Sequence, residues 1–123
     1  MCAICGMINN SGRQVDGELL RKMTDIMNYR GPDESGLHVK ENVGLGHRRL
    51  KIIDLYTGHQ PIANEDNTVF LVCNGEIYNF KELRAELENK GHRFKSQSDN
   101  EVILHLYEEI GIECLENLRG MFA

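Results

Sequence analysis

The chain lacks several features that would place it in a specialised class of protein. It has no tryptophan and two prolines among 123 residues, with no repeat and no low-complexity segment. No apolar run approaches the ~20 residues that cross a bilayer, and the first residues lack the basic-then-apolar pattern of a signal peptide. Lys and Arg total 14 against 19 Asp and Glu, which argues against a nucleic-acid-binding surface. These absences predict a cytoplasmic protein of one domain, without a membrane or nucleic-acid partner.

The four cysteines do not form the two pairs that a zinc site would need. Cys2 and Cys5 have CxxC spacing, but Cys73 and Cys114 are isolated, and the five histidines form no tight pair in the sequence. Since no export signal is present, we expect reduced thiols and not disulfides. The sequence therefore predicts no metal site. A non-catalytic, metal-binding CxxC module remains the alternative from another class.

The stretch MCAICG places a cysteine directly behind the initiator methionine. If Met1 is removed, Cys2 carries both a thiol and a free α-amino group. An α-amino group generally has a pKa of about 7.7–8.0, so near neutral pH part of it can accept the thiol proton. One residue would then supply both nucleophile and base. Cys5 alternates with the apolar residues of the same stretch and is expected in the core.

Apolar periodicity and capping residues predict an α+β chain. Asp16 should cap the first helix, and Glu41-Asn42 should form the turn between two strands. Asn79 with Glu82, and Ser98 with Glu101, resemble capping boxes. We expect a buried strand at 2–9, a helix at 16–31, two strands within 35–55, a strand at 68–74, helices at 79–92, 98–111 and 112–120, and a short strand at 93–96.

The last three residues, MFA, start an apolar run that stops without a polar terminus. This is typical of a piece of a longer chain, and we expect further sequence beyond Ala123.

Six stretches join glycine or proline to polar groups at the ends of apolar segments, where scaffolds present functional side chains. They are MCAICG, RGPDESG, GHRRL, QP, NGEIYN and SDNEVI. In this order and spacing they resemble the class II glutamine amidotransferase domain over essentially the whole chain. The match is closest to glutamine-hydrolysing asparagine synthetases, because related branches typically carry threonine and an aromatic residue where this chain has Arg48-Arg49-Leu50. Ala3 and Lys51 depart from the glycine and serine that the family often has.

The resemblance implies a fold, a reaction and partners. The fold would be the N-terminal nucleophile αββα sandwich, with two mostly antiparallel sheets between helical layers, truncated here. Residues 2–123 would be the N-terminal part of the amidotransferase domain. They would convert L-glutamine and water to glutamate and ammonia through a thioester on Cys2. A downstream synthetase domain, absent from this sequence, would use ATP and Mg²⁺ to convert aspartate to asparagine. This segment itself would need no cofactor, and a homodimer is left open.

Two donors are expected for the oxyanion that forms when a thiolate attacks an amide carbon. The side-chain amide of Asn74 is one, and the backbone N–H of Gly75 is the other, with no Cβ to obstruct the approach. A tight Asn-Gly turn is the purely structural alternative. On the resemblance, Glu76 would contact the substrate's α-amino group.

The two charges of free glutamine call for a cation and an acceptor. The guanidinium of Arg49 suits the α-carboxylate, and Asp99 suits the α-ammonium. The alternative for Asp99 is an acid in the first turn of a helix. Arg48 should point to the opposite face of the strand. The resemblance adds backbone groups around Leu50 and Ile53 to the pocket.

RGPD at 30–33 allows two interpretations. It could be a rigid turn with an internal pair between Arg30 and Asp33, or part of the pocket rim. The acceptor of the ammonia is also open, since another asparagine synthetase-like enzyme could act on a different carboxylate. Sequence after Ala123 would decide that question.

Overall fold

The computed structural model describes residues 2–123, so the expected removal of Met1 lies outside the described residues. The chain divides into two compact units. Of the described residues, the first unit comprises 2–51, 59–61 and 72–74, and the second comprises 52–58, 62–71 and 75–123. Among residues 2–123, no helix is long and apolar enough to cross a membrane.

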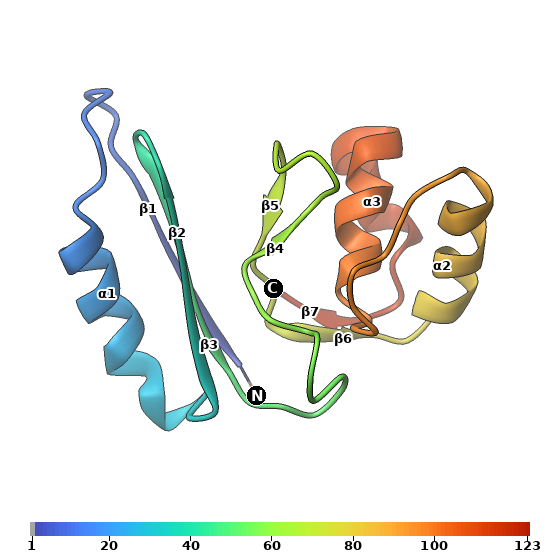
Figure 1. The fold of residues 1–123 in the computed structure, drawn as a ribbon, viewed down its shortest axis with the longest axis horizontal. Helices are drawn as coiled ribbons and strands as arrows, with labels where there is room; N and C mark the ends of the chain where they lie inside the picture. The colour runs from blue at the N-terminus through green and yellow to red at the C-terminus, as the bar shows by residue number, and fades with distance from the viewer. Residues whose placement is uncertain (1) are drawn as a thin grey trace. The chain divides into compact units, whose positions relative to one another are not determined.

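The first unit is a three-stranded antiparallel sheet with one helix on it (Figure 1). The expected hairpin is confirmed: Glu41 adopts a left-handed conformation with φ 52°, and the strands on either side of Glu41-Asn42 pair residue by residue. The strand order is β1-β3-β2, which makes β1 an edge strand. This explains why the first strand is only partly buried, although a buried strand was predicted. The elements are β1 (Ala3–Ile8), α1 (Gly17–Ile26), a 3-10 turn η1 (Met27–Tyr29), β2 (Glu34–Lys40) and β3 (Val43–Arg49).

Helix α1 begins where the sequence predicts. The carboxylate of Asp16 accepts hydrogen bonds from the backbone N–H groups of Glu18 and Leu19, at 2.9 and 3.2 Å. The helix lies close against β3 because Gly46 has no side chain: a Cβ there would be 2.3 Å from the hydroxyl oxygen of Thr24. Cys5 is half-buried at this contact, with its sulfur 3.3 Å from the same hydroxyl.

The second unit combines two short antiparallel strand pairs with helices (Figure 1). Helix α3 is its centre: it contacts α2, η2 and β4, and its first six residues are all buried. The α+β class is therefore confirmed in both units. The elements are β4 (Ile62–Ala63), β5 (Phe70–Leu71), β6 (Gly75–Ile77), α2 (Phe80–Asn89), α3 (Glu101–Ile110), the 3-10 helix η2 (Gly111–Asn117) and β7 (Gly120–Phe122).

Two strand predictions were wrong because side chains take the backbone groups that a strand would pair. The strand expected at 68–74 is reduced to β5. Both backbone groups of Cys73 are bonded to the side chain of Gln60, at 2.6 and 3.0 Å. No strand forms at 93–96. There the carboxylate of Glu101 accepts from the backbone N–H groups of Lys95 and Ser96, at 2.7 and 2.8 Å.

Both predicted capping boxes were also wrong. The Asn79 side chain makes no capping bond to α2; it bonds to the backbone of Asn117 and Arg119, at 2.9 Å each. Helix α3 begins after Asn100, not at Ser98, because Glu101 is engaged by the preceding loop. In both cases the side chain expected in the capping box forms hydrogen bonds elsewhere: Asn79 with residues distant in sequence, and Glu101 with the preceding loop.

Candidate active site

The thiol of Cys2 lies against the backbone of Leu50 at the end of β3. Its sulfur accepts from the Leu50 N–H at 3.4 Å and donates to the Leu50 carbonyl at 3.6 Å. The pairing of Ala3 with Arg48 brings about this arrangement, because it sets Cys2 beside the residues that follow β3. The contact uses only the backbone of Leu50, the kind of contribution that the resemblance implies. Cys2 is half-buried, so the sulfur is positioned by the protein without being sealed from solvent.

The guanidinium of Arg49 is buried and held by the carboxylate of Glu34, a residue without an expected role. Arg49 is 4% exposed, and its Nη1 lies 3.1 Å from Oε2 of Glu34. The hairpin could have predicted this partner, because a two-residue turn at Glu41-Asn42 sets Glu34 directly opposite Arg49. Glu34 therefore orients Arg49 from the neighbouring strand.

Two further cations share the same carboxylate. The Nζ of Lys51 lies 2.5 Å from Oε1 of Glu34, and Nδ1 of His59 lies 3.0 Å from Oε2. Burial works to raise the pKa of Glu34, but the bonds from Lys51 and Arg49 outweigh it, and the pKa is held below its usual range. Glu34 is thus an anion surrounded by three basic side chains, which we call the Glu34 cluster: Glu34, Arg49, Lys51 and His59.

Arg48 and RGPD have structural contacts. The Nε of Arg48 donates to the Gly31 carbonyl at 3.1 Å, and its Nη1 lies 3.8 Å from Asp25, so it turns away from the partners of Arg49. A Cβ on Gly31 would be 2.4 Å from the Arg48 backbone. The carboxylate of Asp33 accepts from the Lys51 N–H at 2.8 Å, where a pair with Arg30 had been considered. These contacts favour the rigid-turn interpretation.

His47, two residues before Arg49, is a buried neutral base. It is 1% exposed, and within the described residues its Nε2 has no hydrogen-bond partner. Burial lowers its pKa to about 4, against a backbone bond with Cys73 that favours the charged form. His47 therefore carries no charge near neutral pH and adds none to the Glu34 cluster.

In the second unit, Gly75 opens β6 and does not lie in a tight turn. It pairs with Phe122, and a Cβ would be 2.3 Å from the Met121 carbonyl oxygen. The purely structural interpretation as an Asn-Gly hairpin turn is therefore wrong, although strand packing alone already requires glycine. Asn74, the residue before it, is half-buried; within residues 2–123 its side-chain amide forms no hydrogen bond, which leaves its donors available.

Asp99 is a buried carboxylate that is bonded to β6. It is 2% exposed, and its Oδ2 accepts from the Ile77 N–H at 2.7 Å. Burial, and less strongly the charge of Glu76, raise its pKa. Because Asn100 is the N-cap of α3, Asp99 precedes the helix, and its assignment to the first turn was wrong. Of the remaining expected residues, Ile53 is 36% exposed on a loop.

The structure thus groups the expected residues in two sets. Cys2, Arg49, Leu50 and Asn74 belong to the first unit, and Ile53, Gly75, Glu76 and Asp99 belong to the second. The assignment of Arg49 and Asp99 to the two ends of one glutamine molecule stays a prediction.

Known proteins resemble this chain along its whole length. Residues 1–123 match the model of a family described as "Glutamine amidotransferase domain". Asparagine synthetase [glutamine-hydrolyzing] 2 of Bacillus subtilis is 46% identical over 126 residues, which cover 100% of this chain and 17% of that relative. Asparagine synthetase [glutamine-hydrolyzing] 2 of Arabidopsis thaliana is 50% identical over 121 residues, covering 98% of this chain and 20% of the relative. The chain therefore spans about a fifth of the length of these relatives.

Proposed function

The chain belongs to the glutamine amidotransferase domain family, and on that basis we propose that it hydrolyses glutamine to glutamate and ammonia. The whole protein would then be a glutamine-hydrolysing asparagine synthetase of the cytoplasm. The observation that carries the proposal is the placement of the Cys2 sulfur against the backbone of Leu50, the residue that follows the buried Arg49. The residues that we propose as nucleophile and as carboxylate-binding group belong to one compact unit.

The proposed reaction begins on Cys2. Its α-amino group, freed by removal of Met1, takes the thiol proton, and the thiolate attacks the side-chain amide carbon of glutamine. The N–H of Leu50 donates to the sulfur at 3.4 Å and would hold it in place for the attack. The C–N bond breaks as the amide nitrogen takes up a proton and leaves as ammonia. Water then hydrolyses the γ-glutamyl thioester, releasing glutamate and regenerating the thiol.

Asn74 and Gly75 are proposed as the donors to the oxyanion. The Asn74 amide has donors available, and removal of one such donor typically costs roughly 3–4 kcal/mol of transition-state stabilisation. A second part of the substrate site would recognise the amino-acid head. Arg49 would bind the α-carboxylate, Asp99 the α-ammonium, and Glu76 would assist Asp99 beside β6.

The fate of the ammonia depends on sequence outside this chain. The relatives are named as asparagine synthetases, so we propose that ammonia passes to a synthetase domain of the same protein, which converts aspartate to asparagine with ATP and Mg²⁺. No described residue is assigned to ATP or Mg²⁺. An asparagine synthetase-like enzyme that amidates another carboxylate is the alternative. Product analysis with aspartate as the acceptor separates the two.

Covalent labelling tests the proposed nucleophile. The full-length enzyme is treated with 6-diazo-5-oxo-norleucine, and the intact mass and peptide map are measured. We expect one adduct, on Cys2, and an N-terminus that begins at Cys2. Cys2→Ser should abolish labelling, whereas the matched change Cys5→Ser should leave it intact. An adduct on Cys5, or Met1 retained in active enzyme, would show that the proposed amine-assisted mechanism is wrong.

A further inference from the structure

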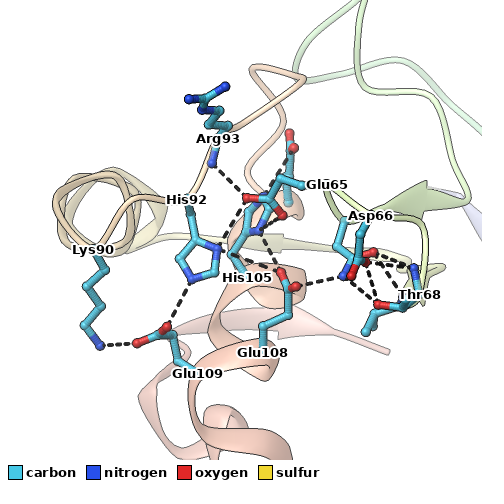
Figure 2. A network of polar contacts seen from close by, with 12 residues as sticks. Glu65, Asp66, Thr68, Lys90, His92, Arg93, His105, Glu108 and Glu109 are labelled. Atoms are coloured by element: carbon cyan, nitrogen blue, oxygen red, sulfur yellow. Dashed lines mark hydrogen bonds and ion pairs between the residues drawn. The ribbon is translucent and has the colours of Figure 1, made fainter.

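Four side chains of the second unit, none of them assigned to glutamine, converge on one another (Figure 2). Glu65 follows β4, His92 follows α2, and His105 and Glu108 lie on α3. We call them the His–Glu cluster. Each offers one ligand atom, and these atoms all lie within 4.8 Å of one another. The sequence shows no tight pair of histidines, yet the fold brings the rings of His92 and His105 to 4.8 Å between centroids.

The inward-facing atoms have spacings close to those of a tetrahedral metal site. Nδ1 of His105 lies 3.0 Å from Glu108 and 3.4 Å from Glu65. Nδ1 of His92 lies 3.5 Å from Oε1 of Glu65, the other oxygen of that carboxylate, and 3.9 Å from Oε2 of Glu108. Four ligands at the 2.0–2.2 Å distances of zinc would be separated by roughly 3.3–3.6 Å. Only small side-chain shifts would therefore be needed to seat an ion.

The outer nitrogen of each imidazole faces a carboxylate. Nε2 of His92 lies 3.2 Å from Glu109, and Nε2 of His105 lies 3.6 Å from Glu101, a fully buried residue. Histidines that bind metals commonly donate their second N–H to a carboxylate, which fixes the tautomer and turns the other nitrogen towards the ion. Among the described residues His92 has this arrangement, whereas Nε2 of His105 faces Glu101 at a distance too long for a hydrogen bond and has no hydrogen-bond partner. In both rings Nδ1 is directed inward.

The carboxylates of the cluster are anchored as well. Oε1 of Glu108 accepts from the side-chain amide of Asn64 at 2.7 Å, and Oε1 of Glu65 accepts from the Arg93 N–H at 2.9 Å. In each case the second oxygen, Oε2, is the one near His105. The anchoring groups therefore come from outside the cluster and hold its carboxylates in place.

Exposure and charge also suit a cation. The His105 side chain is 1% exposed, whereas that of Glu65 is 35% exposed and leaves a route from solvent. The ring nitrogens of His105 lie 3.0 Å from Glu108, 3.4 Å from Glu65 and 3.6 Å from Glu101. The surroundings of this imidazole are thus strongly anionic.

We propose that Glu65, His92, His105 and Glu108 bind one divalent transition-metal ion of the zinc type. Two imidazoles and two carboxylates suit zinc better than Mg²⁺ or Ca²⁺, which take oxygen ligands. All four positions of a tetrahedral site are filled by protein, as in structural sites. The ion would tie the loops after β4 and α2 to helix α3.

Zinc binding by the full-length protein tests this assignment. After chelator treatment, Zn²⁺ is titrated in competition with a chromophoric chelator, for wild type, His92→Ala, Glu109→Gln and the control His38→Ala. We expect the wild type and His38→Ala to share one tight site that is lost, or weakened at least tenfold, in His92→Ala. Glu109→Gln should weaken it about tenfold through the second N–H of His92.

A measurement on the wild type alone covers the case in which a variant fails to fold. Crystals grown with Zn²⁺ should show anomalous density at the zinc edge among the four side chains. Identical zinc isotherms for wild type and His92→Ala, or zinc density only outside the cluster, would overturn the proposal. A zinc site here would leave the glutaminase assignment untouched, because the cluster shares no residue with it.

Discussion

Replacing Arg49 with lysine keeps the positive charge but removes the planar guanidinium, so it tests whether the geometry of the cation matters for glutamine binding. The guanidinium is 4% exposed and bonded through Nη1 to Glu34 at 3.1 Å. A lysine can keep that ion pair, but its single ammonium offers no planar fork for a second, bidentate carboxylate. If the substrate carboxylate is then left without its partner in a desolvated site, we expect a loss of about 2–4 kcal/mol in kcat/KM. At 1.36 kcal/mol per decade, this is roughly a 30- to 900-fold decrease.

The assay compares glutamine-dependent and ammonia-dependent synthesis by the full-length enzyme. Ammonia carries no amino-acid head, so its turnover should be nearly unchanged in Arg49→Lys, while KM for glutamine rises. Arg48→Lys makes the same chemical change on the neighbouring residue, whose Nε bonds to the Gly31 carbonyl. If Arg48→Lys raises the glutamine KM as much as Arg49→Lys does, or if ammonia-dependent turnover falls in parallel, Arg49 is structural and the reasoning is refuted.

Three further predictions concern other residues. Asp99→Asn keeps an oxygen for the Ile77 N–H but loses the charge, so glutamine kcat/KM should fall by about 2 kcal/mol or more, roughly 30-fold, with Asp33→Asn as the control. Asn74→Ala should lower glutaminase kcat with little change in KM and spare ammonia-dependent synthesis; equal loss of both activities would contradict an oxyanion role. The pKa of His47 is about 4 in the folded protein and 6.5 in the unfolded chain. The stability that its burial as a neutral imidazole provides is therefore present above pH 6.5 and is lost as the pH falls towards 4. The free energy of unfolding of the 123-residue chain, measured in urea, should therefore fall by about 3 kcal/mol more than that of His47→Gln between pH 7.5 and pH 4. Parallel pH profiles of the two proteins would contradict this.

Local signals predicted the first unit well. The turn at Glu41-Asn42 and the cap at Asp16 involve residues close in sequence, and both formed as expected. A two-residue turn also fixes which residues face each other, so the pairing of Glu34 with Arg49 could have been read from the hairpin. That part of the candidate site was predictable in principle, although only Arg49 was named from the sequence.

Long-range side-chain bonds were not predictable from the same signals. Asn79 has the sequence of a helix cap, but its amide is used by Arg119, 40 residues away. Gln60 replaces a strand partner for Cys73, and His92 meets His105 only because α2 and α3 pack together. Local capping rules consider only hydrogen-bond partners that are close in sequence. Folding also brings distant backbone and side-chain groups within reach of the same polar side chain.

The Glu34 cluster bears directly on how a buried arginine can both be held in place and still attract substrate. A guanidinium paired one-to-one with a carboxylate would be oriented but electrically neutralised. Here Glu34 is shared by the side chains of Arg49, Lys51 and His59, at 3.1, 2.5 and 3.0 Å. The nearby carboxylate of Asp33 is exposed and bonded to a backbone N–H, so water screens it. If Arg49 binds an α-carboxylate as we propose, Lys51, which stands where the family often has serine, offsets part of the negative charge of Glu34 beside it.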